Sequence, residues 1–299
     1  EAKLSDLDIY GKKIMGNGVV NHYTVDNSIQ RSIIIENVNL KSGTQVLKSG
    51  YIGGFASGVN EITIRNCTIE ENVVIGYDKN QSLIGSFAGE FNGTIENCVS
   101  YADVYGTDNI GGIVSRKGQS MGYCRITNCE FYGNVVASGE HAGGIMASGY
   151  VAESAPNTPC ATIKNCAVYG NVQGKDHVGG IFGGEPGIVS CWANGKGYIQ
   201  DNYFGGTIIS DGKFVGAIIG YMNSVNQYNV IENNCFRENC GAENGIGAIK
   251  IVESTAGDPL GKDKDKLSKG YSEEEILSGT VVKVLNGSES SFKNWAQGE

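Results

Sequence analysis

A unit of about thirty residues recurs along most of this chain. Its clearest copy spans residues 161–184, ATIKNCAVYGNVQGKDHVGGIFGG, and contains an Asn-Cys pair followed by a Gly-Gly-Ile element. The residue after the Asn marks the copies, at Val38, Cys67, Cys98, Cys129, Cys166, Tyr203 and Cys235. Successive markers lie 29, 31, 31, 37, 37 and 32 residues apart. A period in this range predicts a stacked array of similar units.

Each copy alternates apolar and polar residues like a strand. In one copy Ile126, Cys129 and Phe131 are expected to face inward, and Asn128 marks a bend. Period-two alternation with β-branched residues and glycine punctuation indicates strands, and no copy sustains a 3.6-residue period. Three short strands per copy describe one coil of a parallel β-helix, in which neighbouring coils pair about 4.8 Å apart. We therefore predict an all-β, right-handed parallel β-helix of about seven coils.

Three segments follow from this pattern. Residues 1–31 have few marks of the repeat and are expected to form a cap or an irregular first coil, because an open β-helix end exposes strand edges. Residues 32–251 carry the repeats. Residues 252–299 contain a charged link and a small α/β extension, in which Ser272 and Glu275 have capping-box spacing. We predict a short helix there, followed by an apolar strand.

Insertions lengthen the later copies at one position, after the Gly-Gly-Ile element. They span residues 116–123, 148–159, 185–197 and 221–229. Insertions at the same position of successive coils project from one edge, which is often where repeat arrays bind their partners.

The repeat also resembles the GLUG motif, whose signature is a Gly-hydrophobe-hydrophobe-Gly element. The element is seen here at Gly180-Ile181-Phe182-Gly183, with looser forms in other copies. Families with GLUG repeats are similar to large exported bacterial proteins, some of them associated with immunoglobulin A peptidases. The segment near Trp295 is similar to one that accompanies repeat arrays in gut bacterial surface proteins. The resemblance implies location and architecture, without an agreed activity.

Composition excludes several classes of protein. The net charge is −9 and the 23 basic residues are scattered singly, so nucleic-acid binding is not expected. No apolar run approaches the roughly 18 residues that span a bilayer. The chain begins at Glu1 without Met, and we interpret it as a mature or excised fragment. We expect a monomer outside the cell or on a bacterial cell surface, without a cofactor.

Nine cysteines raise the question of disulfides and metals. The five at marker positions are expected to stack in the core, because free Cys is a small, usually buried residue. The other four are Cys124, Cys160, Cys191 and Cys240. Cys160 and Cys191 flank insertions in adjacent coils and could pair in an oxidising environment. The Asn before each marker is expected to form a ladder at a left-handed bend.

A polar corner precedes the Gly-Gly pairs. It contains Asp108, Glu140 and Asp176, and the residues after the last two are His141 and His177. Stacked coils bring such groups close enough to share a cation or to raise a carboxylate pKa for acid-base chemistry. Solvated turns explain the same residues, and Ser82 and Lys213 interrupt the acidic series. We therefore predict no metal site, and keep the corner as the alternative catalytic site.

An aromatic series lies three residues after three of the markers, at Tyr101, Tyr132 and Tyr169. Tyrosines at coil spacing could form a strip on which sugar rings stack, or could stack on each other and stiffen the sheet. We select these residues as the candidate ligand site. The predicted function is a non-catalytic, adhesin-like binding module or spacer that contacts a glycan or a host or cell-surface protein. The alternative is a polysaccharide lyase or glycoside hydrolase that uses the acidic corner.

Overall fold

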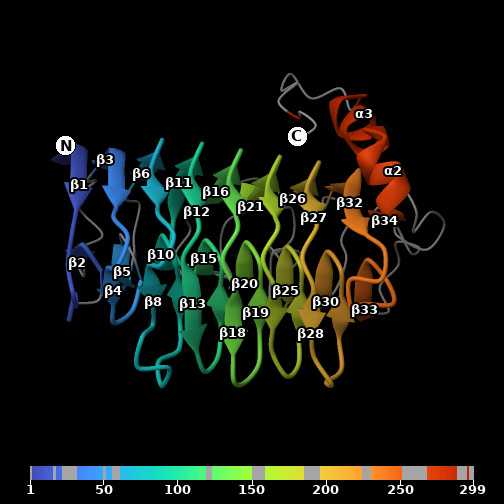
Figure 1. Cartoon of the computed structure of the whole chain (residues 1–299), viewed down its shortest axis with the longest axis horizontal. Helices are drawn as coiled ribbons and strands as arrows, with labels where there is room; N and C mark the ends of the chain where they lie inside the picture. The colour runs from blue at the N-terminus through green and yellow to red at the C-terminus, as the bar shows by residue number, and fades with distance from the viewer. Residues whose placement is uncertain are drawn as a thin grey trace.

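A computed structural model describes residues 2–15, 18–21, 32–49, 52–55, 61–118, 123–149, 159–184, 196–223, 230–250, 268–287 and 295. Its strands pair in parallel with the corresponding strands of the coils before and after, so that stacked sheets wind round one long axis (Figure 1). The predicted parallel β-helix is confirmed.

Five strips of parallel strands, here called faces, run along the axis. The first face contains β1 (Ala2–Ile9), β3 (Ser32–Leu40), β6 (Glu61–Arg65), β11 (Gly93–Glu96), β16 (Cys124–Thr127), β21 (Pro159–Lys164), β26 (Lys196–Gln200) and β31 (Val230–Glu232). The second contains β7 (Thr68–Ile69), β12 (Val99–Ser100), β17 (Glu130–Phe131), β22 (Ala167–Val168), β27 (Tyr203–Phe204), β32 (Asn234–Arg237) and β34 (Ser268–Tyr271). The long strand β3 bends at Asn37 and joins these two faces, since its end pairs with β7.

Shorter strands make the other three faces. The third face contains β4 (Gln45–Val46), β8 (Val74–Ile75), β13 (Asp103–Gly106), β18 (Val135–Ala137), β23 (Val172–Gln173) and β28 (Ile208–Ile209). The fourth contains β9 (Ile84–Gly85), β14 (Ile110–Gly111), β19 (Ala142–Gly143), β24 (Val178–Gly179) and β29 (Val215–Gly216). The fifth contains β2 (Val20–Asn21), β5 (Ile52–Phe55), β10 (Ala88–Phe91), β15 (Val114–Lys117), β20 (Met146–Ser148), β25 (Phe182–Gly184), β30 (Ile219–Asn223) and β33 (Ile246–Lys250).

One complete coil therefore holds five strands, as in β16 to β20, and the prediction of three was wrong. Two left-handed residues in this coil mark the additional bends. Asn128, at φ 54°, separates β16 from β17, and His141, at φ 61°, lies before β19. The Gly-Gly-Ile element, residues 143–145, begins at the end of β19 and connects it to β20.

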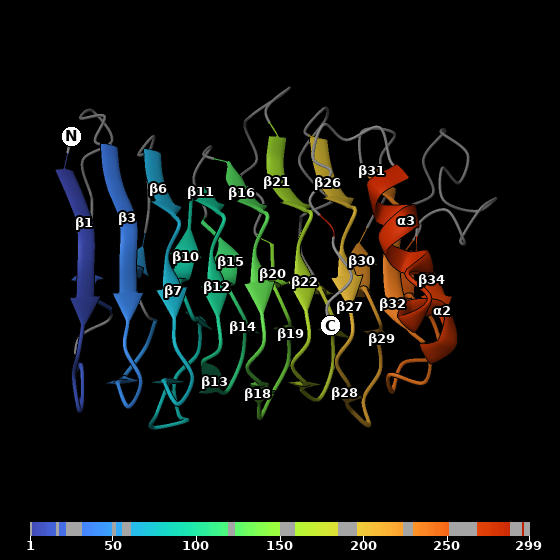
Figure 2. The ribbon, with the colours of Figure 1, turned by 45° about the horizontal axis from the view of Figure 1, so that its top comes forward.

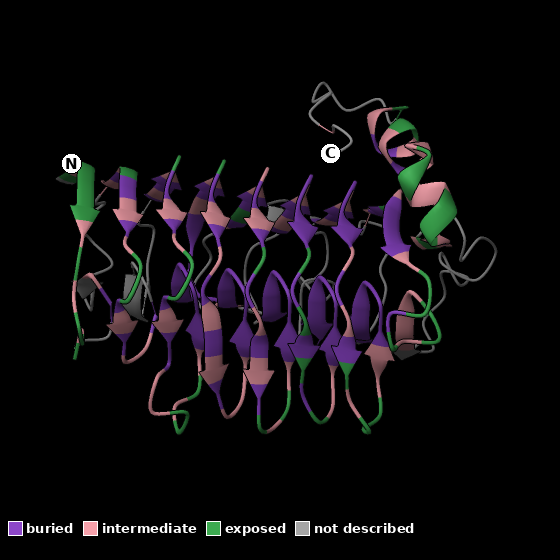
Figure 3. Cartoon of the chain, viewed as in Figure 1, coloured by how far each residue is buried: buried purple, intermediate pink, exposed green. Residues whose placement is uncertain are grey.

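The interior is a continuous apolar core along the axis, visible as the buried strands of Figure 3. Cys67, Cys98, Cys129 and Cys166 lie in it, each no more than 1% exposed, which confirms the predicted inward stack for these four. Each Sγ donates to the main-chain oxygen two residues earlier, at 3.2–3.3 Å. Burial raises the pKa of the Cys129 thiol well above its usual range.

The last two markers were predicted wrongly, by one residue. Tyr203 pairs with Ala167, and Cys235 pairs with Tyr203, so both lie on the outer side of the second face. The inward position after Cys166 is instead taken by Asn202 and then Asn234, both buried. Two polar residues stand in a row at each of these bends, and the first of them, Asp201 and Asn233, adopts the left-handed conformation at φ 56° and 53°.

Two short helices, α2 (Glu273–Leu277) and α3 (Thr280–Gly287), follow β34 and lie beside β32 and β34 (Figure 2). The predicted capping box of Ser272 and Glu275 is present. The strand predicted after it was wrong, because residues 280–287 form α3. Val281 and Leu285, four residues apart, bury one side of α3 against an outer cluster of Ala167, Tyr203, Cys235 and Tyr271. Neither described helix is long and apolar enough to cross a membrane.

Several predictions concern residues at the chain's edges and insertions. At the N-terminal end, β1 pairs in parallel with β3 along its length. Cys124 and Cys240 are buried free thiols. Cys191 and the side chain of Cys160 lie outside the described residues, so their predicted pairing stays a prediction. The predicted bounds of the insertions were too wide, because residues 116–117, 148, 159, 196–197 and 221–223 belong to strands of the fifth or first face. The remainder connects these two faces, with residues 119–122, 150–158, 185–195 and 224–229 outside the described part.

Candidate functional site

The polar corner is built on a row of left-handed residues just before the fourth face. Asn109, His141 and His177 have φ of 58°, 61° and 55°, and Leu83 and Phe214 continue the row at 63° and 59°. This conformation is strained for side chains other than Gly and Asn, so the surrounding structure must hold it. Main-chain hydrogen bonds to the next coil do so, since the N–H of His141 donates to the oxygen of Asp176 at 3.0 Å.

The three acidic residues of the corner have different roles. Asp108 Oδ1 accepts the main-chain N–H of Glu140 at 2.8 Å, and Asp176 Oδ1 accepts the main-chain N–H of Lys213. Each aspartate therefore joins its own coil to the next. The Glu140 side chain is exposed, and within the described part of the chain no hydrogen bond or ion pair engages its carboxylate.

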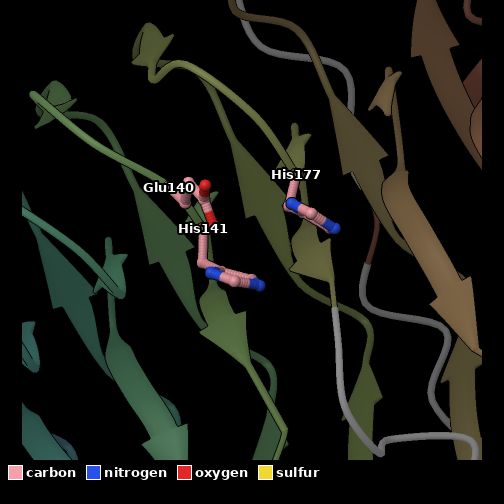
Figure 4. Close-up of side chains that lie close together, drawn as sticks. All are labelled: Glu140, His141 and His177. Atoms are coloured by element: carbon pink, nitrogen blue, oxygen red, sulfur yellow. The ribbon is translucent and has the colours of Figure 1, made fainter. Parts of the chain in front are cut away.

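The two histidines stack on one another. Their ring centroids are 4.5 Å apart, and the ring planes differ by 20°. Figure 4 shows both rings beside the Glu140 carboxylate, and one donor atom from each of the three residues lies within 4.8 Å of the others. The His177 ring also contacts Phe214, at 4.8 Å, and the edge of Tyr221, at 5.2 Å. Burial, and then the neighbouring His177, lower the pKa of His141 to about 4.

Protein stability should fall in mild acid because of His141. Its pKa is about 4 in the folded chain against 6.5 for an ordinary histidine, so the unfolded chain binds the proton first. Stability is then full above about pH 6.5, falls between about pH 6.5 and pH 4, and changes no further below. The loss should be on the order of 2 kcal/mol, less than full burial gives because the ring is partly exposed. Urea unfolding across this pH range measures it, and His141→Asn should flatten the slope.

The three tyrosines of the candidate ligand site form a stack. The rings of Tyr101 and Tyr132 are 4.7 Å apart at 14°, and those of Tyr132 and Tyr169 are 4.7 Å apart at 17°. Tyr203, tilted at 5.9 Å, follows Tyr169 and leads to the outer cluster under α3. Both faces of the Tyr132 ring are therefore occupied by its neighbours. Tyr132 is 37% and Tyr169 42% exposed, and the Tyr132 hydroxyl donates to Glu130 Oε2 at 2.6 Å.

The predicted asparagine ladder is present at the bends of the second to fifth copies of the repeat. Side-chain amides donate from Asn97 to Asn66 at 3.4 Å, from Asn128 to Asn97 at 3.1 Å, and from Asn165 to Asn128 at 3.3 Å. Such amide ladders are a device of stacked strands. Each of these amides donates to the equivalent asparagine one coil earlier, and the ladder ends at Asn165, whose Oδ1 is buried without a partner.

A second polar ladder was missed by the sequence analysis. Asn171 donates to Asn134 Oδ1 at 3.0 Å, and Asn134 donates to Asp103 Oδ1 at 2.8 Å. The repeated Tyr-Gly-Asn-Val of residues 132–135 and 169–172 was the signal that could have found it.

A buried charged group on the fifth face was also missed. Arg116 Nη2 lies 2.7 Å from Glu90 Oε2, with side chains 21% and 3% exposed. Lys117 Nζ donates to the oxygen of Gly118 at 2.9 Å, and burial lowers the pKa of Lys117. No sequence motif predicts that these residues are buried, because charged side chains on a strand are ordinarily exposed to solvent.

Comparison with protein-family models, with curated proteins and with solved structures finds no match to this chain. The resemblance of the repeats to the GLUG motif therefore stays a prediction.

Proposed function

We propose that this chain is a non-catalytic β-helix module of an exported or cell-surface bacterial protein, acting as a rigid spacer that also presents surface for binding. One observation carries the proposal: side chains that could have done chemistry make their contacts with equivalent residues one coil away. The tyrosines and histidines stack, the asparagines form amide ladders, and two corner aspartates accept main-chain N–H groups. Such contacts stiffen an array whose stability is a sum of neighbour interactions.

The polar corner gives little support to the alternative function as a glycosidase. A glycosidase needs two carboxyl groups that can exchange protons or attack the substrate. Asp108 and Asp176 each accept a main-chain N–H of the next coil through Oδ1, a role that joins coils. Among the described residues, Glu140 is the acidic member of this corner whose carboxylate makes no hydrogen bond.

Incubation with a panel of neutral and uronic-acid polysaccharides tests the non-catalytic proposal. We expect neither new reducing ends nor unsaturated products that absorb in the ultraviolet. Turnover that is lost in Glu140→Gln would establish the enzyme alternative. Turnover that survives this substitution would place a catalytic site elsewhere in the chain, and would equally overturn the proposal.

Glycan binding along the tyrosine stack is a second proposal, supported by the partial exposure of Tyr132 and Tyr169. A glycan there would meet ring edges and phenol hydroxyls, so we expect weak binding that depends on hydrogen bonds. On a glycan array, Tyr169→Phe should weaken binding and leave thermal stability nearly unchanged. No binding by the parent protein, or equal binding by Tyr169→Phe, would remove the stack as a ligand site.

A further inference from the structure

Three metal-ligating side chains meet at the polar corner without being used in its hydrogen bonding. Glu140 and His141 come from one coil and His177 from the next, and one donor atom of each lies within 4.8 Å of the others (Figure 4). Within the described part of the chain, no hydrogen bond engages the ring nitrogens of either histidine, and His177 Nδ1 is buried without a partner. A buried polar atom without a partner calls for an explanation, and an unfilled ion site is one.

We propose that Glu140, His141 and His177 bind a divalent transition-metal ion of the zinc class, which links two neighbouring coils. Two imidazole nitrogens and one carboxylate oxygen are ligands that Zn²⁺, Cu²⁺ and Ni²⁺ accept, whereas Ca²⁺ and Mg²⁺ favour oxygen alone. The inference goes beyond the proposed spacer function and does not depend on it. It also departs from the expectation, drawn from the sequence, that the corner holds no metal.

The ligands must move a short way to bind the ion. Zinc lies about 2.0–2.1 Å from histidine nitrogen, which places tetrahedral ligand atoms roughly 3.4 Å apart. The present separations of the ligand atoms, none above 4.8 Å, therefore have to shorten by at most about 1.4 Å. The lone pairs of stacked rings lie in nearly parallel planes, so the rings must also turn out of their stack. Glu140, exposed and long, can follow.

This rearrangement limits the affinity. Binding gives up the stacking of His141 on His177, and none of the described residues makes a hydrogen bond that would orient either ring. We expect one ion per chain and a micromolar dissociation constant, weaker than a preformed structural zinc site. Because the ion joins two coils, it should raise the melting temperature as its concentration rises.

Equivalent positions in other coils show which residues can replace the histidines while keeping the left-handed backbone conformation. His141→Asn places at 141 the residue found at 109, and His177→Phe places at 177 the residue found at 214. Glu140→Gln keeps the shape of the third ligand and removes its charge. The chain has 3 histidines, so His22→Ala is the matched control. Melting temperatures without metal identify any variant that fails to fold.

Isothermal titration calorimetry of the parent with ZnCl₂ should show a single saturable site. Each of the three corner substitutions should weaken it roughly tenfold or more, and His22→Ala should leave it unchanged. With Cu²⁺, electron paramagnetic resonance should show two nitrogen ligands in the parent and one in His177→Phe. Zinc held by cysteines would survive in all three variants. Such survival, or the absence of saturable binding by a folded parent, would overturn the proposal.

Discussion

Gly180→Ala should lower the free energy of unfolding by roughly 3 kcal/mol or more, because the added methyl group has no room between two coils. A Cβ atom at Gly180 would lie 2.1 Å from the main-chain oxygen of Ala217 and 2.4 Å from Cγ of Phe204. The first of these atoms belongs to the backbone of the next coil, so it can move only if the coil spacing changes. The Gly-Gly element of the repeat is thus a requirement of close stacking.

Denaturant unfolding measures this effect, and Gly287→Ala is its control. At Gly287 no described heavy atom beyond the chain neighbours and the α3 backbone lies within 4 Å of the added Cβ, so the change there should stay within about 0.5 kcal/mol. Equal stabilities for Gly180→Ala and Gly287→Ala would mean that the coils are not packed as closely as the structure has them.

Asn202→Ala should cost roughly 3 to 5 kcal/mol, because it leaves buried polar groups without partners. Asn202 Oδ1 accepts the N–H of Cys166 at 2.9 Å, and its Nδ2 donates to the oxygen of Ile163 at 3.0 Å and to Asn234 Oδ1 at 2.9 Å. All of these bonds are buried, where water cannot replace the lost amide.

The matched comparison is Asn171→Ala. Asn171 is an exposed member of the second asparagine ladder and donates to Asn134 Oδ1 at 3.0 Å. Water can take the place of its amide, so the expected loss is within about 1 kcal/mol. Equal losses at the two positions would contradict the burial of Asn202.

The fold could be predicted because its signals are local and repeated. The repeat shows inward Ile and Cys, left-handed Asn and closely packed Gly at equivalent positions of successive coils. Because the same residues recur, each copy supports the interpretation of the others. The prediction of which residues face inward was wrong where two polar residues stand together at a bend. Nothing in Asp201-Asn202 shows which residue turns the chain and which enters the core. The structure puts Asn202 inward, so Tyr203 and Cys235 lie on the outer side of the second face, buried under α3.

The prediction of a C-terminal strand was wrong for a different reason. Val281 to Leu285 is rich in β-branched residues, which favour strands, and tertiary packing overrides that preference. In α3 the burial of Val281 and Leu285 on the outer cluster decides the outcome. That cluster contains Tyr203 and Cys235, which the sequence analysis had placed in the core. With those two residues assigned to the wrong side of the sheet, the surface that α3 packs on could not be predicted.

The candidate site was half predictable. Repeat spacing shows which residues lie side by side, and Tyr101, Tyr132 and Tyr169 do so, as do His141 and His177. It does not show how rings turn about their side-chain bonds, or which carboxylates accept main-chain N–H groups. Those details separate a surface that binds a sugar from one that holds the coils together.

A double-mutant cycle at Tyr132 and Tyr169 tests most directly the claim that these side chains act on one another along the axis. Unfolding free energies are measured for the parent, Tyr132→Ala, Tyr169→Ala and the double variant. The stack at 4.7 Å predicts an interaction energy of about 0.5–1.5 kcal/mol between the two rings. Losses that simply add, with no interaction energy, would contradict the account.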